Sequence, residues 1–534
     1  MPDGTPPVTD AAALAEALRH VGRPLAVVDL DGRTAIGYGG AARIGTDPSA
    51  ERTGHPLMAY VPAILPEHLG DSGFRKAHGL RYAYVAGAMA NGITSERMVE
   101  AMGRAGMLGF FGSAGLDPQR VTAAIVHIQE NLGELPYGFN LIHSPSDPQL
   151  ESTIADLYLQ HGVRLIEASA YLDLTLPLVR YRLAGIHATP SGEIVAPNKI
   201  VAKVSRIEVA RKFLNPPPTA MLNALVQSGF ITTQQAGWAE RIPMADDLTA
   251  EADSGGHTDN RPALALLPTM LALRDEIQRT RNYAVPPRIG AAGGVATPAS
   301  VAAAFAMGAA YVLTGTVNQA CLESGTSPTV REMLAQAGQA DVIMAPAADM
   351  FEMGVKVQVL KWGTMFAIRA RKLYDLYRAF AGLEQIPVDQ RTILERDFYR
   401  CTLEQVWEQT ARYFTERDPG QIARAQRDPK HKMALVFRAY LGQSSRWAIN
   451  NEPSRKADYQ VWCGPAMGAF NEWTAGSFLA DVNRRDVVTV AMNLLVGAAA
   501  LSRSHWLRAQ GVRLPAETQT FRPRELAELD TLLQ

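Results

Sequence analysis

The sequence has few cysteines and lacks long apolar runs. Its 534 residues include three cysteines, Cys321, Cys401 and Cys463, whose wide spacing suits neither a disulfide framework nor a Cys-x-x-Cys zinc motif. No run of 18 apolar residues occurs, and the first 20 residues lack the pattern of a secretory signal peptide. We therefore expect a protein of the reducing cytoplasm that is not inserted in a membrane.

An excess of charge of either sign is also missing. Lys and Arg number 52 against 53 Asp and Glu, which gives a formal net charge of −1. This balance gives no global attraction to nucleic acid or to an anionic membrane, and we expect neither as a partner. Hydrophobic residues make up 47% of the chain, enough to fill the cores of two or three globular domains.

Strand-like apolar runs recur from Tyr82 onward and alternate with helix-like segments, a pattern that favours a parallel sheet. Together they span 235 residues, close to the roughly 250 residues typical of a (β/α)8 TIM barrel. A doubly wound open sheet is the structural alternative. The eight predicted strands are 82–87, 108–113, 137–142, 165–170, 200–204, 248–253, 288–293 and 311–316.

The rest of the chain divides around this barrel. Residues 1–80 form an N-terminal segment of unknown role, and residues 81–344 form the barrel, with an insertion around 213–285. After Pro346 the pattern changes to long helical segments without intervening strands. We therefore predict a mostly helical domain over 345–534.

Two glycine turns near the end of the barrel indicate an anion site. Gly293 and Gly294 follow the seventh strand and precede Thr297, a helix N-cap residue followed by proline. Gly315 and Thr316 follow the eighth strand. Backbone N–H groups of glycine turns and helix N-termini bind phosphate, and (β/α)8 barrels often place such a site after strands 7 and 8. The alternative is a packing unit whose glycines only allow close contact between helix and strand.

A turn of small residues, Gly87, Ala88 and Met89, follows the first strand. It can admit a planar ring against the backbone, or it is an ordinary βα turn. Asn140, in the third strand, either satisfies a buried neighbour or binds a ligand.

Lys203, in the fifth strand, needs an anionic partner if it is buried. That partner is either Glu167 on the fourth strand or the electron-rich edge of a cofactor. The ion pair is favoured, and Lys203 also counts among the cofactor-binding candidates.

The strongest catalytic candidate follows the sixth strand, in the run EADSGGHTDN. Gly256 lets the backbone approach a ligand, and His257, with an ordinary pKa of about 6.5, can give or take a proton near neutrality. Asp253 and Asp259 could join His257 in binding a divalent metal. Because the run has no recognised ligand spacing, we predict no metal site.

Several motifs resemble the superfamily of flavin-dependent enoyl reductases and nitronate monooxygenases: GAMANGI, YGFNLIHSP, EADSGGHTDNRPALALLP, and GAAGGVATP followed by GTVNQ. The closer resemblance is to the PfaD family, the trans-acting enoyl reductases of polyketide and polyunsaturated fatty acid synthases. It continues through MGVKVQVLKWGTMFAIRARKLYDLY and DYQVWCGPAMGAFNEW in the helical half, and so covers about residues 80–505.

The resemblance implies that FMN binds in the barrel. Its phosphate is expected near the turns at 293–294 and 315–316, and its ring near 87–89 and Asn140, with Gly256 and His257 on the other side. The resemblance also implies that NADPH reduces the flavin, which passes a hydride to the β-carbon of an enoyl thioester on an acyl carrier protein. His257 matches the proton donor proposed for the superfamily.

Three functions stay open: a carrier-dependent enoyl reductase, an oxidase of small nitronates, and a non-catalytic subunit for synthase assembly. The helical half favours the first, because it offers a surface for a carrier protein or for a homodimer. An acyltransferase partner is also open. We expect the aromatic residues Trp462, Phe470 and Trp473 to pack in the core or between domains rather than to line a substrate site.

Overall fold

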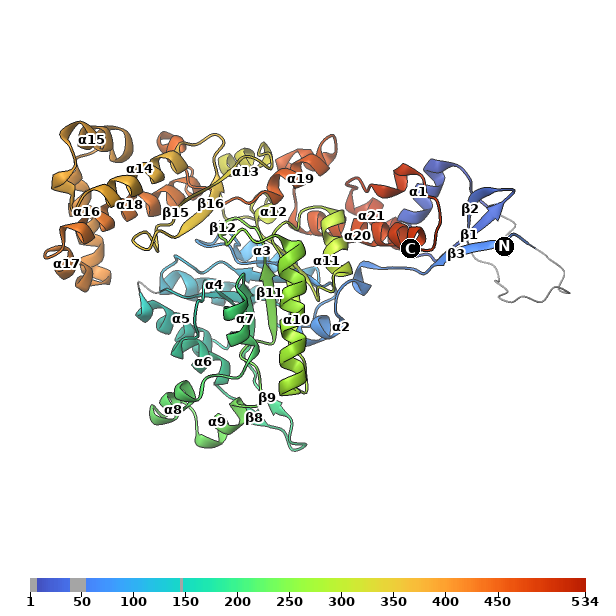
Figure 1. The fold of residues 1–534 in the computed structure, drawn as a ribbon, viewed down its shortest axis with the longest axis horizontal. Coiled ribbons are helices and arrows are strands. Elements are labelled where there is room, and N and C mark those ends of the chain that lie inside the picture. Colours follow the sequence, from blue (N-terminus) through green and yellow to red (C-terminus); the bar gives the residue numbers. More distant parts are fainter. Residues whose placement is uncertain (1–6, 39–53, 145–146) are drawn as a thin grey trace.

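The computed structural model describes residues 7–38, 54–144 and 147–534. At its centre is a closed barrel of eight parallel strands surrounded by helices (Figure 1), as predicted. Each barrel strand pairs with the barrel strand that follows it in the sequence, and β14 closes the barrel on β4. The strands are β4 (Tyr84–Ala86), β5 (Leu108–Phe111), β6 (Gly138–Ile142), β7 (Leu165–Ser169), β10 (Lys199–Val204), β11 (Asp247–Glu251), β13 (Arg288–Ala292) and β14 (Val312–Thr314).

The barrel strands are short and apolar, and they are covered on both faces, by the helices outside and by the packed interior of the barrel. Almost every residue in these strands is buried, which is why they appear in the sequence as continuous apolar runs. Several of the covering helices begin at a Ser, Thr or Asp that accepts a hydrogen bond from the first turn. The helices around the barrel are α2 (Ser72–His78), α3 (Glu96–Arg104), α4 (Pro118–Leu132), α5 (Pro148–Gln160), α6 (Leu176–Leu183), α7 (Ile207–Leu214), α10 (Ala263–Arg281) and α11 (Pro298–Ala306).

Additional elements extend the barrel at the end away from the helical region (Figure 1). A two-stranded sheet follows α6, and two short helices occupy the predicted insertion between α7 and β11. These elements are β8 (His187–Ala188), β9 (Ile194–Val195), α8 (Thr219–Gln227) and α9 (Thr233–Ala239).

The region after the barrel is not free of strands, and that prediction is wrong. β15 (Val342–Pro346) and β16 (Lys356–Leu360) form a hairpin, and β16 also pairs with β12 (Gly256–His257) from the loop after β11. The segment KVQVL in β16 alternates apolar and polar residues, but it is only five residues long. This sheet attaches the helical region to the carboxyl end of the barrel. The boundaries 81–344 and 345–534 remain our proposal.

Helices make up most of the remaining chain. One group packs around its own apolar core, which includes Phe351, Phe437 and Tyr440. Another lies over the top of the barrel (Figure 1). The first group is α14 (Phe366–Ala379), α15 (Val388–Ile393), α16 (Leu403–Arg417), α17 (Pro419–Ala425) and α18 (Pro429–Ile449); the second is α12 (Thr316–Gln319), α13 (Pro328–Ala335) and α19 (Ala466–Thr474).

Both ends of the described chain meet in a terminal lobe on one side of the barrel (Figure 1). The buried guanidinium of Arg503, in the helix Val487–Ala509, donates hydrogen bonds to the carbonyl groups of Leu18 and Arg23, which joins this helix to the N-terminal segment. The lobe contains α1 (Ala11–Arg19), the antiparallel strands β1 (Leu25–Leu30), β2 (Arg33–Gly37) and β3 (Leu57–Val61), and the helices α20 (Val487–Ala509) and α21 (Leu526–Leu533).

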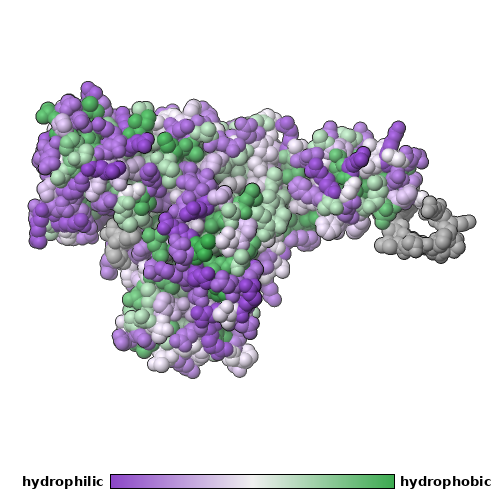
Figure 2. Space-filling view, viewed as in Figure 1, coloured by the Kyte–Doolittle hydropathy of each residue, from purple (hydrophilic) through white to green (hydrophobic). Residues whose placement is uncertain are grey.

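Among the described residues, α20 is the one helix long and apolar enough to cross a membrane by length and composition. However, 89% of its most apolar window is buried inside the protein, and the helix packs against α11 of the barrel. On the face drawn in Figure 2, hydrophilic side chains are spread over the barrel, the helical region and the terminal lobe. The apolar character of α20 is thus explained by its place in the core.

Candidate active site

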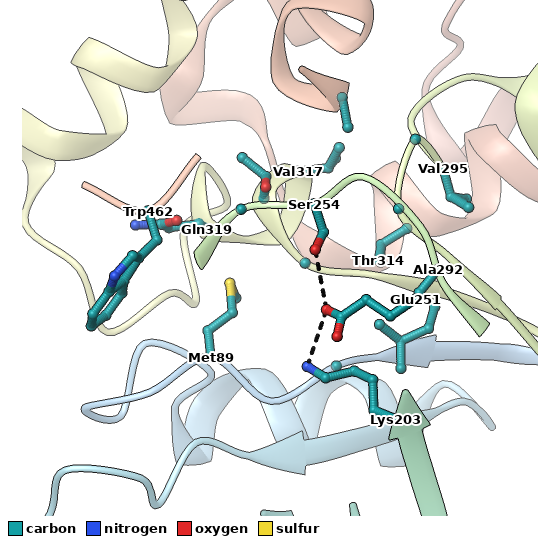
Figure 3. Close-up of a pocket in the computed structure, with 18 of the residues that line it drawn as sticks. Met89, Lys203, Glu251, Ser254, Ala292, Val295, Thr314, Val317, Gln319 and Trp462 are labelled. Atoms are coloured by element: carbon teal, nitrogen blue, oxygen red, sulfur yellow. Dashed lines mark hydrogen bonds and ion pairs between the residues drawn. The ribbon is translucent and has the colours of Figure 1, made fainter. Parts of the chain in front are cut away.

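A pocket that is partly open to solvent lies at the carboxyl ends of the barrel strands (Figure 3). This is the end at which (β/α)8 barrels carry their active sites. Eight of the eleven predicted site residues line this pocket, although they are far apart in the sequence. They are Gly87, Ala88, Met89, Lys203, Gly293, Gly294, Gly315 and Thr316.

The two glycine turns form one wall of the pocket. Gly293 has φ +81°, and a Cβ added to it would lie 2.6 Å from the backbone carbon of Ala252, so only glycine fits. At Gly294 and Gly315, by contrast, an added Cβ would meet no described atom within 4 Å. Within the described chain, the N–H groups of Gly294, Val295 and Gly315 donate to no other protein group. This wall therefore offers free backbone donors and room for an anion.

The N-terminus of α11 contributes less to this wall than the sequence suggested. The Thr297 hydroxyl accepts from the N–H of Ser300 at 3.2 Å. In return, the Ser300 hydroxyl accepts from the N–H groups of Ala296 and Thr297, both at 2.9 Å. These three N–H groups are used within a capping box. The anion-binding capacity thus comes mainly from the glycine turns.

Three charged side chains meet at the floor of the pocket. The Lys203 Nζ lies 3.5 Å from Oε2 of Glu167 and 3.7 Å from Oε1 of Glu251, which confirms the predicted pairing with Glu167. Ser254 donates a hydrogen bond to Oε1 of Glu251 at 3.2 Å, so a chain of contacts runs from Ser254 through Glu251 to Lys203 (Figure 3). Glu167 also accepts from the N–H of Ala88 at 3.2 Å.

The protonation of this cluster is set by burial and by mutual attraction. Burial raises the pKa of Glu167, and the Lys203 cation offsets only part of that effect. Burial alone would lower the pKa of Lys203, but the two carboxylates outweigh it and raise that pKa above its usual value. Lys203 is therefore a permanent cation. Oε1 of Glu167 is buried without a hydrogen-bond partner in the described chain, which leaves the cluster incompletely satisfied.

Asn140 does not line the pocket but lies buried behind its floor. Its Nδ2 donates to the carbonyl of Glu167 at 3.0 Å and to the Ser169 hydroxyl at 2.6 Å. Of the two roles open from the sequence, this geometry fits the satisfied buried neighbour. Asn140 fixes the strand that carries Glu167.

His257 and Gly256 also lie outside the pocket lining, at its edge, where β12 pairs with β16. The Nε2 of His257 is 3.2 Å from Oδ1 of Asp349. Nearby, Asp259 forms an ion pair with Arg206 at 2.9 Å and accepts from the Ser205 hydroxyl, rather than joining His257. Among the described residues, no group of three or more His, Cys, Asp or Glu side chains is arranged to hold a metal ion.

Residues from the helical region complete the pocket, and the sequence did not indicate them. Trp462 packs against the apolar core of the helical region, as predicted, but it also lines the cavity, which was not expected. In Figure 3 it lies on the side of the cavity opposite Val295. The N–H of Gly464 donates to the Thr316 hydroxyl at 3.2 Å. A Cβ on Gly464 would lie 2.8 Å from the nitrogen of Gly255, so the two backbones touch.

Two families match parts of this chain. Residues 74–362, more than half of the chain, match nitronate monooxygenase. Residues 380–459 match the inserted helical domain of [acyl-carrier-protein] S-malonyltransferase. The first match contains the barrel and the β15–β16 hairpin, and the second lies in the helices around α16 and α18.

Similar proteins come from biosynthetic synthases. One of the polyunsaturated fatty acid synthase subunits of Thraustochytrium sp. is 46% identical over 458 residues, which are 84% of this chain and 30% of the relative. Polyketide biosynthesis protein PksE of Bacillus subtilis is 43% identical over 439 residues, which are 82% of this chain and 57% of PksE. The chain thus spans less than two thirds of the length of either relative.

A solved structure is similar over its whole length. The enoyl reductase domain of MlnA, from the macrolactin biosynthesis cluster of Bacillus amyloliquefaciens, is 40% identical with a TM-score of 0.78. The similarity covers 83% of this chain and 99% of that domain. It includes the barrel, and the family match places the same barrel among oxidoreductases. The chain belongs to the nitronate monooxygenase family.

Proposed function

We propose that this protein is an FMN-dependent enoyl reductase that uses NADPH to reduce the α,β-double bond of enoyl thioesters on an acyl carrier protein. The observation that carries the proposal is the 40% identity to the MlnA enoyl reductase domain across 99% of that domain. The pocket supports it, because it combines a wall of free backbone donors with a permanent cation at its floor. We further propose that it acts in polyketide or polyunsaturated fatty acid synthesis in the cytoplasm.

The residues present fit FMN. Gly294, Gly315 and Thr316 would hold its phosphate, since the two glycines leave open space and free N–H groups. Met89 and Lys203 would lie beside its ring, where a cation stabilises negative charge on a reduced flavin. When bound, FMN supplies the hydride chemistry, taking a hydride from NADPH and giving it to the β-carbon of the enoyl thioester.

The chain itself has to orient the substrate, exclude water and supply a proton. Trp462 closes the side of the pocket that faces the helical region, which limits access of water to the reacting carbons. Addition of a hydride to the β-carbon leaves an enolate, which needs a proton at the α-carbon. His257 at the edge of the pocket is the proposed donor of that proton. Gly256 gives its backbone the φ of +80° that the turn requires.

An anaerobic spectroscopic experiment tests this function. The holoenzyme is mixed first with NADPH and then with a crotonyl-loaded acyl carrier protein, while the visible flavin band is followed. We expect NADPH to bleach the band and the crotonyl carrier to restore it, whereas a saturated butyryl carrier leaves it bleached. His257→Ala should keep its flavin and be bleached by NADPH, but recover slowly. If no enoyl thioester restores the band, the proposal fails.

The family match over 74–362 supports a second candidate, a flavin oxidase of small nitronates. Recovery of the bleached band only with oxygen or a nitronate would favour this oxidase. A protein that takes up no FMN at all would instead fit a non-catalytic role in synthase assembly.

The proposed macromolecular partner is the carrier protein. The match of 380–459 to a helical domain from an enzyme that acts on acyl carrier protein supports this choice. We keep a homodimer and an acyltransferase partner as further proposals, each of which co-purification and analytical ultracentrifugation with the separate proteins can test.

A further inference from the structure

We propose that Asp349, between β15 and β16, is a positioning residue for His257: it holds the Nε2 proton of the imidazole and leaves Nδ1 as the nitrogen that gives up its proton. This inference rests on the proposed function for its catalytic meaning. The contact between the two side chains does not depend on that function.

The pairing joins two distant parts of the chain. Asp349 lies 92 residues after His257, and its Oδ1 is 3.2 Å from Nε2 of the ring. The backbone of His257 is held at the same place, because His257 pairs with Val357 across the β12–β16 ladder. The side chain of Gln358 donates to Oδ1 of Asp253 and to the carbonyl of Ser254, both at 2.8 Å. The hairpin thus fixes both the loop and the ring of His257.

The pair is surrounded by protein atoms but keeps access to solvent. The side chains of His257 and Asp349 are 36% and 44% exposed. A core histidine would be enclosed, whereas this one can exchange a proton with water after each turnover. Its exposure, together with its place at the edge of the pocket, suits a group that is used and recharged in every cycle.

Other charges around His257 do not replace Asp349. Glu251, at the end of β11, and Lys203, on β10, face the ring from the pocket side with opposite effects on it. Asp253 is engaged by Asn260 and Gln358, and Asp259 by Arg206. Burial alone would lower the pKa of His257, but the contact with Asp349 outweighs it and raises that pKa. Burial would likewise raise the pKa of Asp349, and the hydrogen bond with His257 lowers it instead.

The proton that His257 gives up in the proposed step is replaced from water, so the step balances. Before the step, the imidazolium carries protons on both nitrogens, with the Nε2 proton shared with Asp349. The Nδ1–H bond breaks and a C–H bond forms at the α-carbon, which takes the electron pair of the enolate. A neutral imidazole remains with its proton on Nε2, the tautomer that a carboxylate at Nε2 favours. Water then returns a proton to Nδ1.

Asp349→Asn tests the inference by kinetics. The amide would keep the size of the side chain but not the charge, so we expect the alkaline limb of enoyl-dependent flavin reoxidation to move down by about half a pH unit. At pH values above that limb the rate should fall about threefold, while bleaching by NADPH is unchanged. Asp349→Glu should restore most of the profile. Equal slowing of both half-reactions would indicate a structural role and overturn the inference.

A titration that does not use activity gives the second readout. Histidines labelled with 13C at Cε1 are followed by NMR against pH, and the His257 signal is assigned by its loss in His257→Ala. Asp349→Asn should lower the pKa of His257, and Glu352→Gln should not. Glu352 is a matched control, because it lies on the same segment and pairs with Arg438 at 3.3 Å.

An unchanged titration of His257 in Asp349→Asn would overturn the inference whatever the kinetics show. If the wild-type protein fails to reduce the crotonyl carrier, the proposed function fails. In that case the titration still decides whether Asp349 holds the proton of His257.

Discussion

The two ends of the barrel each bury a carboxylate among cations, and they do so differently. At the amino end, Asp247 contacts His78 at 2.7 Å and Arg288 at 2.5 and 3.1 Å, so both of its oxygens are paired. At the carboxyl end, Glu167 has one cation, Lys203, at 3.5 Å, and its second oxygen has no partner in the described chain. Both carboxylates are fully buried. The two carboxylates therefore differ in their hydrogen-bond and ion-pair partners and not in their exposure to solvent.

This contrast separates a group used for stability from a group kept for binding. Burial would raise the pKa of Asp247, but the contacts with His78 and Arg288 lower it overall. Burial does raise the pKa of Glu167. A fully satisfied buried ion cluster is rigid, whereas an incompletely satisfied one has capacity for a ligand. In a (β/α)8 barrel, stability is expected at the amino end and function at the carboxyl end.

Asp247→Ala removes the buried carboxylate at the amino end of the barrel and has the largest expected effect on stability. It leaves Arg288 and His78 buried without their partner, which destabilises a protein by about 3–5 kcal/mol. Thermal unfolding measures the loss. Asp275→Ala is the control, because the ion pair of Asp275 with Arg274 leaves its side chain 55% exposed, and its loss should stay within about 0.5 kcal/mol. Similar losses in both variants would contradict the assignment of the amino end to stability.

Two lysines at opposite ends of β10 sharpen the comparison. Lys203→Met should weaken FMN binding about 10- to 100-fold, since it removes a charged partner from the pocket. The fold should persist, because Glu167 can take up a proton. Lys199→Met removes a lysine that donates to the carbonyl of Ala77 at the other end of the strand, and should leave FMN affinity unchanged. Quenching of flavin fluorescence measures both. Equal affinities would remove Lys203 from the flavin site.

The sequence predicts the barrel well because its signal is local. Each strand is a short apolar run followed by a helix, and the two glycine turns lie within 25 residues of one another, so their convergence follows from the βα repeat. The pairing of Lys203 with Glu167 could be predicted for the same reason. The residues belong to adjacent parallel strands, and Glu167 pairs in the ladder with Val201, two residues before Lys203.

The parts that the sequence did not predict come from long-range contacts. Trp462 enters the pocket from more than 140 residues beyond Thr316, and Asp349 reaches His257 only because β16 pairs with β12. The periodicity of one segment does not indicate which distant segment it will contact in the fold. The one local signal was the run WCGPAMG, whose Gly464 allows the close contact with Gly255. A glycine alone does not indicate which residue it will contact.

The two carboxylates predict pH dependences of opposite sign. The lowered pKa of Asp247 adds stability that is present above the unfolded pKa and is lost as the pH falls. The raised pKa of Glu167 means that stability is lost as the pH rises through it. As the pH rises to the ordinary aspartate pKa of 3.8, Asp247→Asn should therefore fall further below the wild type in stability, and above that pH the difference should stay constant. Glu167→Gln should instead gain stability relative to the wild type as the pH rises above the ordinary glutamate pKa of 4.5. Urea unfolding on both sides of pH 4 measures both trends, and parallel trends would contradict the comparison.

The smallest expected effect concerns the helix end beside the glycine turns. Ser300→Ala removes the acceptor for the N–H groups of Ala296 and Thr297, which should destabilise the protein by about 1 kcal/mol. FMN affinity should change little, because the turns rather than the helix end supply the donors. Gly294→Ala should weaken FMN binding more, since its φ of +76° disfavours a side chain and the new methyl group would enter the open space of the cradle. If Ser300→Ala alters FMN affinity as strongly as Gly294→Ala does, the end of α11 contacts the phosphate as well, and the carboxyl end binds its ligand through both elements.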